Sequence, residues 1–153
     1  MKAKLLILVL LAAIMTSCWL EKSKYPVVGR WQYTDYEQSV YYTAEFKNNH
    51  EFSLKEKYPP IEEENSIKHH TEKFYGTYTV SENILTLHFT EIQYRNTEYR
   101  DHVLVLDTTI NIPPFADETV QYETDENRNQ LTLIRHFGTD SVTTQVYQRQ
   151  KYK

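Results

Sequence analysis

Apolar and polar residues alternate along most of this chain with a period of two, which is the period of a half-buried β-strand. Four apolar residues in the segment 40–47 would share one face of such a strand: Val40, Tyr42, Ala44 and Phe46. Asn48 and Asn49 favour a tight turn, because asparagine tolerates positive φ angles. The alternation resumes at Phe52 and Leu54, so this stretch predicts a β-hairpin.

The alternating pattern continues toward the C-terminal end. No long segment after Val27 has apolar residues at the i, i+3, i+4 and i+7 spacing of an α-helix. About nine candidate strands follow one another through mostly short turns, which is typical of an antiparallel meander. A sheet of that length usually closes or curls, because open edges invite aggregation. We therefore predict an all-β fold in residues 27–150, a single antiparallel meander that closes into a barrel of about eight or nine strands.

Three features depart from simple alternation. The apolar phase shifts after Phe89, which predicts a β-bulge near Thr90–Glu91. The centre of the segment 99–107 is apolar on both faces, which predicts a strand covered on both sides or packed beneath a loop. Two loops with paired prolines, Tyr58–Asn65 and Asn111–Asp117, interrupt the strands. We expect these loops to frame the mouth of the barrel, because loops at barrel ends commonly carry function.

The N-terminus has the pattern of a secretory signal. A short basic segment precedes an apolar run from Leu5 to Met15, and small residues follow it. The run is too short to span a membrane, which takes about 20 residues. One alternative is an ordinary secretory signal, in which the cysteine that follows, Cys18, is incidental.

Met15-Thr16-Ser17-Cys18 resembles the lipobox of bacterial lipoproteins, in which the cysteine is lipidated after cleavage. The resemblance implies a signal peptide at 1–17, a lipidated Cys18 with a tether to residue 26, and acyl chains such as palmitate that hold the protein to a membrane. Trp19 stands where an Asp would retain an enterobacterial lipoprotein in the inner membrane, so the resemblance favours the outer membrane. Residues 151–153 are then a short C-terminal tail.

Four short motifs, in this order, resemble those of lipocalin-like (calycin) β-barrels in small lipoproteins of Bacteroidota-type bacteria. They are Gly29-Arg30-Trp31, the hairpin from Phe74 to Leu87, its repeat from Tyr122 to Leu133, and the closing strand Val146–Arg149. The resemblance implies that Gly29 and Trp31 lie at the closed end of the barrel, with Trp31 capped by a basic side chain. We choose Arg149 for that side chain, with Arg135 as the alternative, and the contact is structural.

Composition narrows the class of protein further. The chain has 153 residues, which suits a single domain, and its 17 Lys and Arg against 21 Asp and Glu give a net charge of −4. An acidic net charge gives no sign of the basic surface patch that nucleic-acid binding requires, so we predict that the protein binds no nucleic acid. One cysteine excludes an intrachain disulfide.

The histidines and acids do not form a recognisable catalytic or metal motif. His69 and His70 are adjacent, so a strand would turn them to opposite faces. Neighbouring strands could bring His88 and His102 together near Asp101, but zinc needs three or four convergent ligands. The chain also lacks G-x-S-x-G and glycine-rich phosphate motifs. We therefore predict no metal, no cofactor and no enzymatic activity.

Tyrosines are the best candidates for binding. Three of them are in phase with apolar neighbours and, with one phenylalanine of the second proline loop, form the predicted ligand-binding set: Tyr42, Tyr78, Tyr122 and Phe115. Five others are predicted to lie outside: Tyr33, Tyr36, Tyr41, Tyr75 and Tyr147. An eight-stranded barrel is just wide enough to be filled by side chains or to hold one small ligand. The leading function is thus binding of a small apolar or amphipathic molecule, and the alternative is a protein-interaction module with a dry barrel.

Overall fold

The computed structural model describes residues 25–137 and 141–150, and this part of the chain forms ten β-strands and no helix. The strands are β1 (Gly29–Asp35), β2 (Val40–Phe46), β3 (Glu51–Lys57), β4 (Ile61–Glu63), β5 (Ser66–Ser81), β6 (Ile84–Arg100), β7 (Val103–Ile112), β8 (Glu118–Thr124), β9 (Gln130–Phe137) and β10 (Ser141–Arg149). Cys18, the signal peptide and the C-terminal tail lie outside the described residues.

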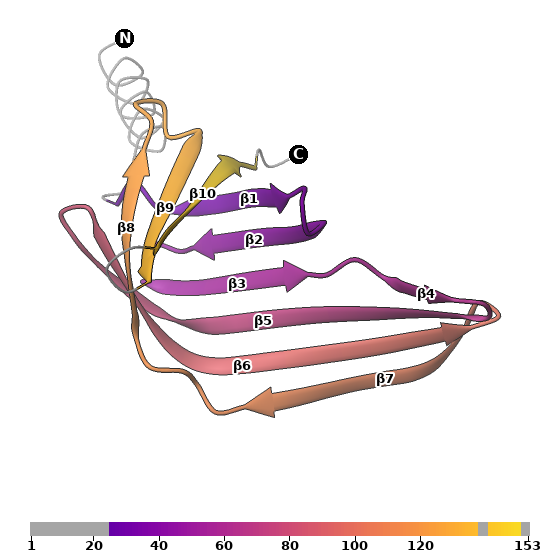
Figure 1. Cartoon of the computed structure of the whole chain (residues 1–153). Helices are drawn as coiled ribbons and strands as arrows, with labels where there is room; N and C mark the ends of the chain where they lie inside the picture. The colour runs from indigo at the N-terminus through magenta and orange to yellow at the C-terminus, as the bar shows by residue number, and fades with distance from the viewer. Residues whose placement is uncertain (1–24, 138–140, 151–153) are drawn as a thin grey trace, which may run out of the picture.

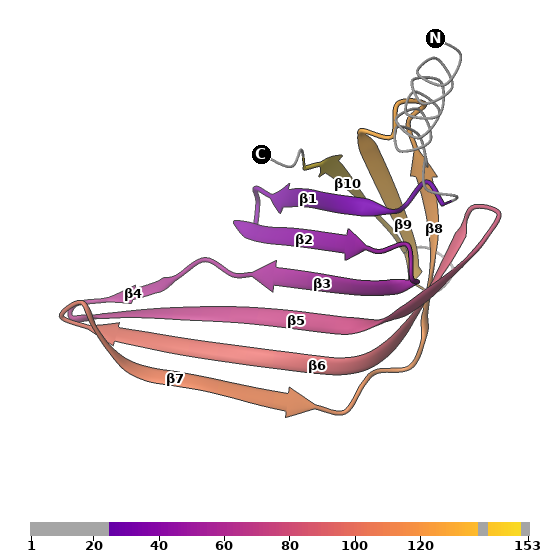
Figure 2. The same ribbon diagram turned by 180° about the vertical axis from the view of Figure 1, so that it is seen from behind.

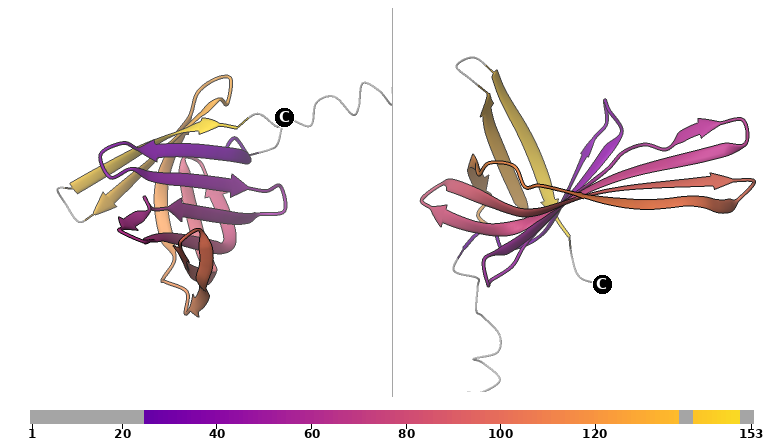
Figure 3. Two further views of the ribbon diagram at one scale, coloured as in Figure 1. Left: turned by 90° about the vertical axis from the view of Figure 1, so that its right-hand side faces the viewer. Right: turned by 90° about the horizontal axis from the view of Figure 1, so that it is seen from below.

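Eight of the strands close a ring in the order β5-β3-β2-β1-β10-β9-β8-β6, because β6 pairs with β8 and also with β5. All neighbouring strands are antiparallel, and the first strand meets the last at Trp31 and Arg149. Figure 3 shows β1 to β3 crossing β8 to β10, so these two groups form opposing walls. The prediction of an all-β antiparallel barrel is confirmed, and its shape is compatible with a lipocalin-like barrel.

The two longest strands leave the barrel together. β8 pairs with β6 only at Ile84–Leu87, whereas β7 pairs with the later part of β6, Ile92–Arg100. β4 and β7 flank the outer parts of β5 and β6, and the four run away from the ring as one sheet (Figures 1 and 2). We call β4, β7, residues 66–73 of β5 and residues 93–100 of β6 the wing.

A β-bulge marks the point where β6 changes partners. Tyr75 is opposite Glu91, but Gly76 is opposite Phe89, so Thr90 is the extra residue. The shift after Phe89 in the apolar pattern predicted this bulge correctly. A Cβ atom at Gly76 would collide with a backbone carbonyl of β6, so only glycine allows the two strands to approach this closely.

The core fills the closed end of the barrel. Trp31 is fully buried, and its indole N–H donates to the Val27 carbonyl at 2.7 Å. The guanidinium carbon of Arg149 lies 5.3 Å from the centre of the Trp31 ring, and Arg149 also donates to the Val28 carbonyl at 3.2 Å. Gly29 has a φ of 148°, and a Cβ atom there would lie 3.1 Å from this guanidinium. Arg149, rather than Arg135, therefore covers Trp31.

The prediction for the segment 99–107 was wrong in two respects. Residues 101 and 102 form a turn with positive φ angles, and β7 begins only at Val103. β7 is the last strand of the sheet order, and its apolar residues are exposed on both faces, from 44% for Leu106 to 63% for Val103. An apolar run indicates a strand, but the neighbours that cover it lie elsewhere in the sequence.

Two of the tyrosines predicted to lie outside point inward. Tyr147 is 3% exposed and Tyr33 packs against the core, whereas Tyr36 and Tyr41 are exposed as predicted. Side chains two residues apart share a face of a strand. Since Arg149 lies over the buried Trp31 ring, Tyr147 lies on the same, inner face of β10.

Candidate functional site at the mouth of the barrel

A cavity of about 550 Å³ opens at the end of the barrel that faces the wing. One wall comes from β2, β3, β5 and β6, the opposite wall from β9 and β10, and the segment from Phe115 to Glu118 lies between them. The cavity therefore lies between the two groups of strands that the ring closure brings face to face.

One part of the cavity is lined by three phenylalanines in mutual contact. The ring centres of Phe74 and Phe89 are 6.1 Å apart, and the ring of Phe115 lies 6.2 Å from each of them. Phe74 is 8% exposed, whereas Phe115 is 53% exposed at the opening. Leu54, which faces Phe74 across the β3–β5 pair, continues this apolar wall. The cluster is suited to an apolar group of a ligand.

The opposite wall is polar. The Arg135 Nε atom donates to Glu118 Oε1 at 2.6 Å, and its Nη1 atom donates to Gln145 Oε1. The Tyr147 hydroxyl donates to the same Gln145 oxygen at 3.2 Å. Burial raises the pKa of Tyr147, so its hydroxyl stays protonated at neutral pH. This network presents a fixed set of polar groups at one side of the cavity.

A row of four facing side chains extends the cavity along the sheet. Tyr42 of β2 is opposite Glu56 of β3, Glu56 is opposite Glu72 of β5, and Glu72 is opposite Tyr94 of β6. Burial raises the pKa of Glu56, the bond that it accepts from the Tyr58 hydroxyl at 3.1 Å lowers it, and the negative charge of Glu72 raises it further. The net shift is upward. Glu56 therefore takes up a proton more readily than an ordinary glutamate.

His70 is placed beside this row by β5. Its Nε2 atom lies 2.9 Å from Glu72 Oε1, and its Nδ1 atom lies 2.7 Å from Asn96 Oδ1. Burial alone would lower the pKa of His70, but the bonds to Glu72 and Asn96 raise it above its ordinary value. The upward shift favours the protonated form of His70 beside Glu72.

The structure separates the four predicted ligand-binding residues into two groups. Tyr42 and Phe115 line the cavity. Tyr78 and Tyr122 lie in the core, where their hydroxyls donate to the carbonyls of Lys47 at 2.7 Å and of Glu82 at 3.0 Å. Neither ring is among those that line the cavity.

The two proline loops also differ in position. The second loop contributes Phe115, Ala116 and Asp117 to the cavity. The first loop, Tyr58–Asn65, contains β4 and lies along the wing, so it does not frame the mouth (Figure 1).

Sequence reasoning missed Arg135, Glu118 and Gln145 as lining residues. They come from three different strands, and the pairing that joins them is not visible in any one segment. One signal was present, since Arg135 is in phase with the inward-facing Leu131 and Leu133 of β9. A charged residue in an apolar phase indicates a buried polar contact or a site.

The histidines considered for a metal are dispersed. His88 Nδ1 lies 2.7 Å from Asp117 Oδ2, His102 is in the β6–β7 turn, and His69 and His70 contact different tyrosines. Among the described residues, no three His, Cys, Asp or Glu side chains are grouped so that they could hold a metal ion. In the same part of the chain, no helix has the length and apolar character needed to cross a membrane.

No protein-family model matches this chain, and neither the curated proteins nor the solved structures include a significant match.

Proposed function

We propose that this protein is a lipid-anchored lipoprotein of the cell envelope whose lipocalin-like barrel binds one small apolar or amphipathic molecule without transforming it. The observation that carries the proposal is the cavity of about 550 Å³ at the barrel mouth. Sites for small molecules typically measure about 300–1,000 Å³ and combine an apolar lining with a few polar groups. The lipobox and Trp19 support anchoring at the outer membrane.

The lining residues define how such a molecule would lie. Its apolar part would contact Phe74, Phe89 and Phe115, and its polar end would face Glu56 and the hydroxyl of Tyr42. On the opposite wall, Arg135 and Glu118 already neutralise each other, so a ligand does not need to supply a charge for either of them. An uncharged or weakly basic polar end fits Glu56 better than an anionic one, because Glu72 is directly opposite Glu56 on the next strand.

The apolar surface that the ligand buries sets its expected affinity. Removing ~200 Å² of apolar ligand surface from water contributes ~5 kcal/mol, before the cost of immobilising the ligand. This free energy corresponds to a dissociation constant of about 0.2 mM, which polar contacts would lower and the cost of immobilisation would raise.

N-phenyl-1-naphthylamine, an uncharged apolar fluorophore, is a suitable probe for this cavity. We expect its fluorescence to rise on binding, and we expect Leu54→Trp to abolish the rise by filling the cavity. Leu104→Trp is the matched control, because it makes the same substitution on the exposed surface of β7. Loss of binding in Leu104→Trp with binding retained in Leu54→Trp would place the probe on the wing and contradict the proposal.

The exposed edge of β7 supports a second candidate function, the binding of an extended strand from a protein partner. β7 hydrogen-bonds to β6 on one side only, and four consecutive residues, Val103 to Leu106, are apolar and exposed. A free sheet edge can accept a further strand through main-chain hydrogen bonds. Cross-linking that traps a protein partner on β7 while the cavity binds no probe would favour this function over the first.

A further inference from the structure

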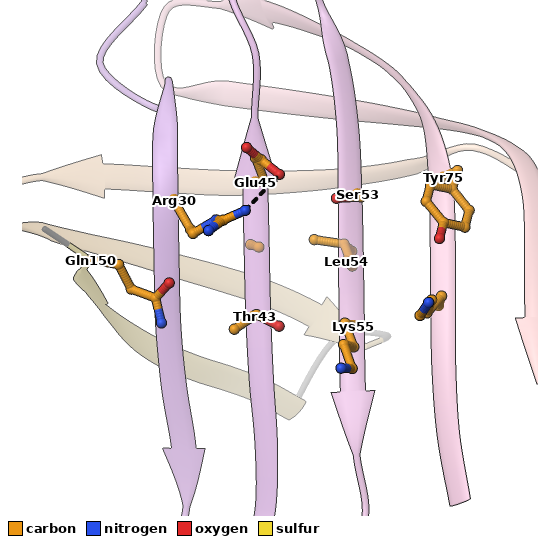
Figure 4. A pocket seen from close by; sticks show the side chains of 10 residues that line it. Arg30, Thr43, Glu45, Ser53, Leu54, Lys55, Tyr75 and Gln150 are labelled. Carbon is orange, nitrogen blue, oxygen red and sulfur yellow. Dashed lines mark ion pairs between the residues drawn. The ribbon is translucent and has the colours of Figure 1, made fainter. Parts of the chain in front are cut away.

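We propose that the outer face of the sheet carries a second binding site, for a phosphate group, between Lys55 of β3 and Lys73 of β5. The register places these two lysines directly opposite each other. Beside them a groove of about 270 Å³ crosses the outer side of β1, β2, β3 and β5 (Figure 4). The side chains of Lys55 and Lys73 point to the other side of the sheet from those of Glu56 and Glu72, because the two pairs alternate along their strands. Three residues of β2 and β3 border both the groove and the cavity at the barrel mouth: Thr43, Leu54 and Lys55.

The position of these two lysines opposite each other is electrostatically unfavourable. Like charges directly opposite each other on neighbouring strands are destabilising. A slip of one residue would place Lys55 opposite Glu72 instead. The slip is prevented because it would turn the inward-facing Leu54 and Phe74, which are also opposite each other, away from the interior. The fold therefore holds two positive charges together on its outer face.

The described residues supply no carboxylate that neutralises either lysine. Neither Lys55 nor Lys73 takes part in an ion pair or a side-chain hydrogen bond within residues 25–137 and 141–150. The nearby acids contact other groups: Glu45 pairs with Arg30 at 3.5 Å, Asp107 pairs with Arg95 at 2.7 Å, and Glu91, opposite Tyr75, accepts a bond from the Gln93 amide at 2.7 Å. Figure 4 shows the first of these pairs at the other side of the groove. The two ammonium groups therefore suit an anionic ligand.

Neutral hydroxyl groups line the same groove as the two lysines. They belong to Thr43, Ser53 and Tyr75. A phosphate monoester carries between about −1.5 and −2 charges at neutral pH and offers three acceptor oxygens. Two lysines match that charge, and lysine is an established phosphate ligand. The phosphate could belong to a lipid headgroup or to a soluble ester, because both present the same chemistry.

The site is local, because the whole chain has a net charge of −4. An acidic protein attracts anions only where cations are concentrated, and binding to such a spot weakens as salt is added. Lys73 also lines a second, smaller groove, in which Asp107 neutralises Arg95, so the excess positive charge on this face comes from Lys55 and Lys73.

The test uses the full chain, titrated with inorganic phosphate at low ionic strength in a calorimeter. The double variant Lys55→Gln, Lys73→Gln is compared with Lys47→Gln, Lys57→Gln, which removes the same charge from residues that do not line the groove. We expect the first pair to weaken phosphate binding by at least about tenfold and the control pair by less than about threefold. Thermal melting without phosphate serves as the folding control, and the first pair should melt no lower than the wild type.

The source of the phosphate is identified with phosphatidylcholine vesicles that contain or lack phosphatidic acid, and the Cys18→Ala chain is used so that the proposed acyl anchor does not bind the vesicles. Vesicle binding that needs both phosphatidic acid and the two lysines supports the proposal and assigns the phosphate to a lipid. Phosphate binding without vesicle binding supports the proposal and assigns it to a soluble ester. Equal weakening in the two double variants, or no phosphate binding by the wild type, overturns it.

Discussion

Single side chains close one end of this barrel and leave the other open. Trp31 is fully buried beneath Arg149, and its indole N–H is bonded to the Val27 carbonyl. At the open end, Tyr42 and Phe115 line a cavity instead of meeting across it. The difference shows why a tyrosine in an apolar phase does not reveal by itself whether it fills a core or lines a site.

Trp31→Ala should lower the free energy of unfolding by about 3–5 kcal/mol, because it removes a large buried ring and leaves a cavity. Urea unfolding followed by circular dichroism measures the change. Tyr36→Ala is the control, since Tyr36 is 88% exposed and its loss should change stability by less than about 0.5 kcal/mol. An unchanged midpoint for Trp31→Ala would show that this ring does not hold the closed end together.

Tyr78 predicts how stability depends on alkaline pH. Burial raises the pKa of Tyr78 from 10.0 to about 12, and its hydroxyl donates to the Lys47 carbonyl. Between these two pH values the unfolded chain releases the Tyr78 proton while the folded chain keeps it. Stability should therefore fall as pH rises from 10 to 12.

Tyr78→Phe should flatten this dependence in urea unfolding experiments over the same pH range. The exposed Tyr36→Phe serves as the control and should keep the slope of the wild type. A slope in Tyr78→Phe as steep as that of the wild type would assign the pH dependence to other groups.

At the scale of elements, the pattern of alternation predicted the strands well and their surroundings poorly. The phase shift after Phe89 located the bulge, because a bulge changes parity within one segment. The exposure of β7 could not be predicted in the same way, since it depends on how far β5 and β6 extend beyond the ring. The inward position of Tyr147 could have been predicted, because Tyr147 is two residues from Arg149 and therefore lies on the same face of β10.

β7 should make the chain self-associate at high concentration, because a long apolar edge strand is open to pairing. Val105→Lys places a charge in the middle of that edge, where Val105 is 50% exposed. We expect association measured by sedimentation velocity to weaken at least about tenfold, which corresponds to about 1.4 kcal/mol.

Tyr41→Lys is the control for this substitution, because Tyr41 is equally exposed but lies on β2, which is paired on both sides. Equal association in the wild type and Val105→Lys would mean that β7 is protected by its twist or by its neighbours.

At the scale of the whole molecule, the barrel and the wing give the sheet two chemically different faces. Glu56, which lines the cavity, and Glu72 lie on one face of the sheet, and Lys55 and Lys73 lie on the other face in the same stretch of β3 and β5. The cavity itself joins strands that are far apart in the sequence, from β2 to β10. The sequence could therefore predict two of its lining residues, Tyr42 and Phe115, but not the polar wall around Arg135.

The proposed lipid anchor predicts where the molecule is found in the cell. Cys18→Ala should move the protein from the membrane fraction to the soluble fraction, because two or three acyl chains hold a protein stably and their loss leaves no anchor. Fractionation followed by immunoblotting measures this, and labelled palmitate should enter the wild type alone. Membrane attachment of Cys18→Ala that resists salt washing would contradict the lipobox interpretation.

Native mass spectrometry of the protein, extracted gently from its own membrane, tests the central claim most directly. The account predicts that the wild type carries one small apolar or amphipathic molecule and that Leu54→Trp, which fills the cavity, carries none. Leu104→Trp should keep the bound molecule, because Leu104 lies on the exposed surface of β7. A wild type without any bound molecule, or a molecule that persists in Leu54→Trp, would contradict the account.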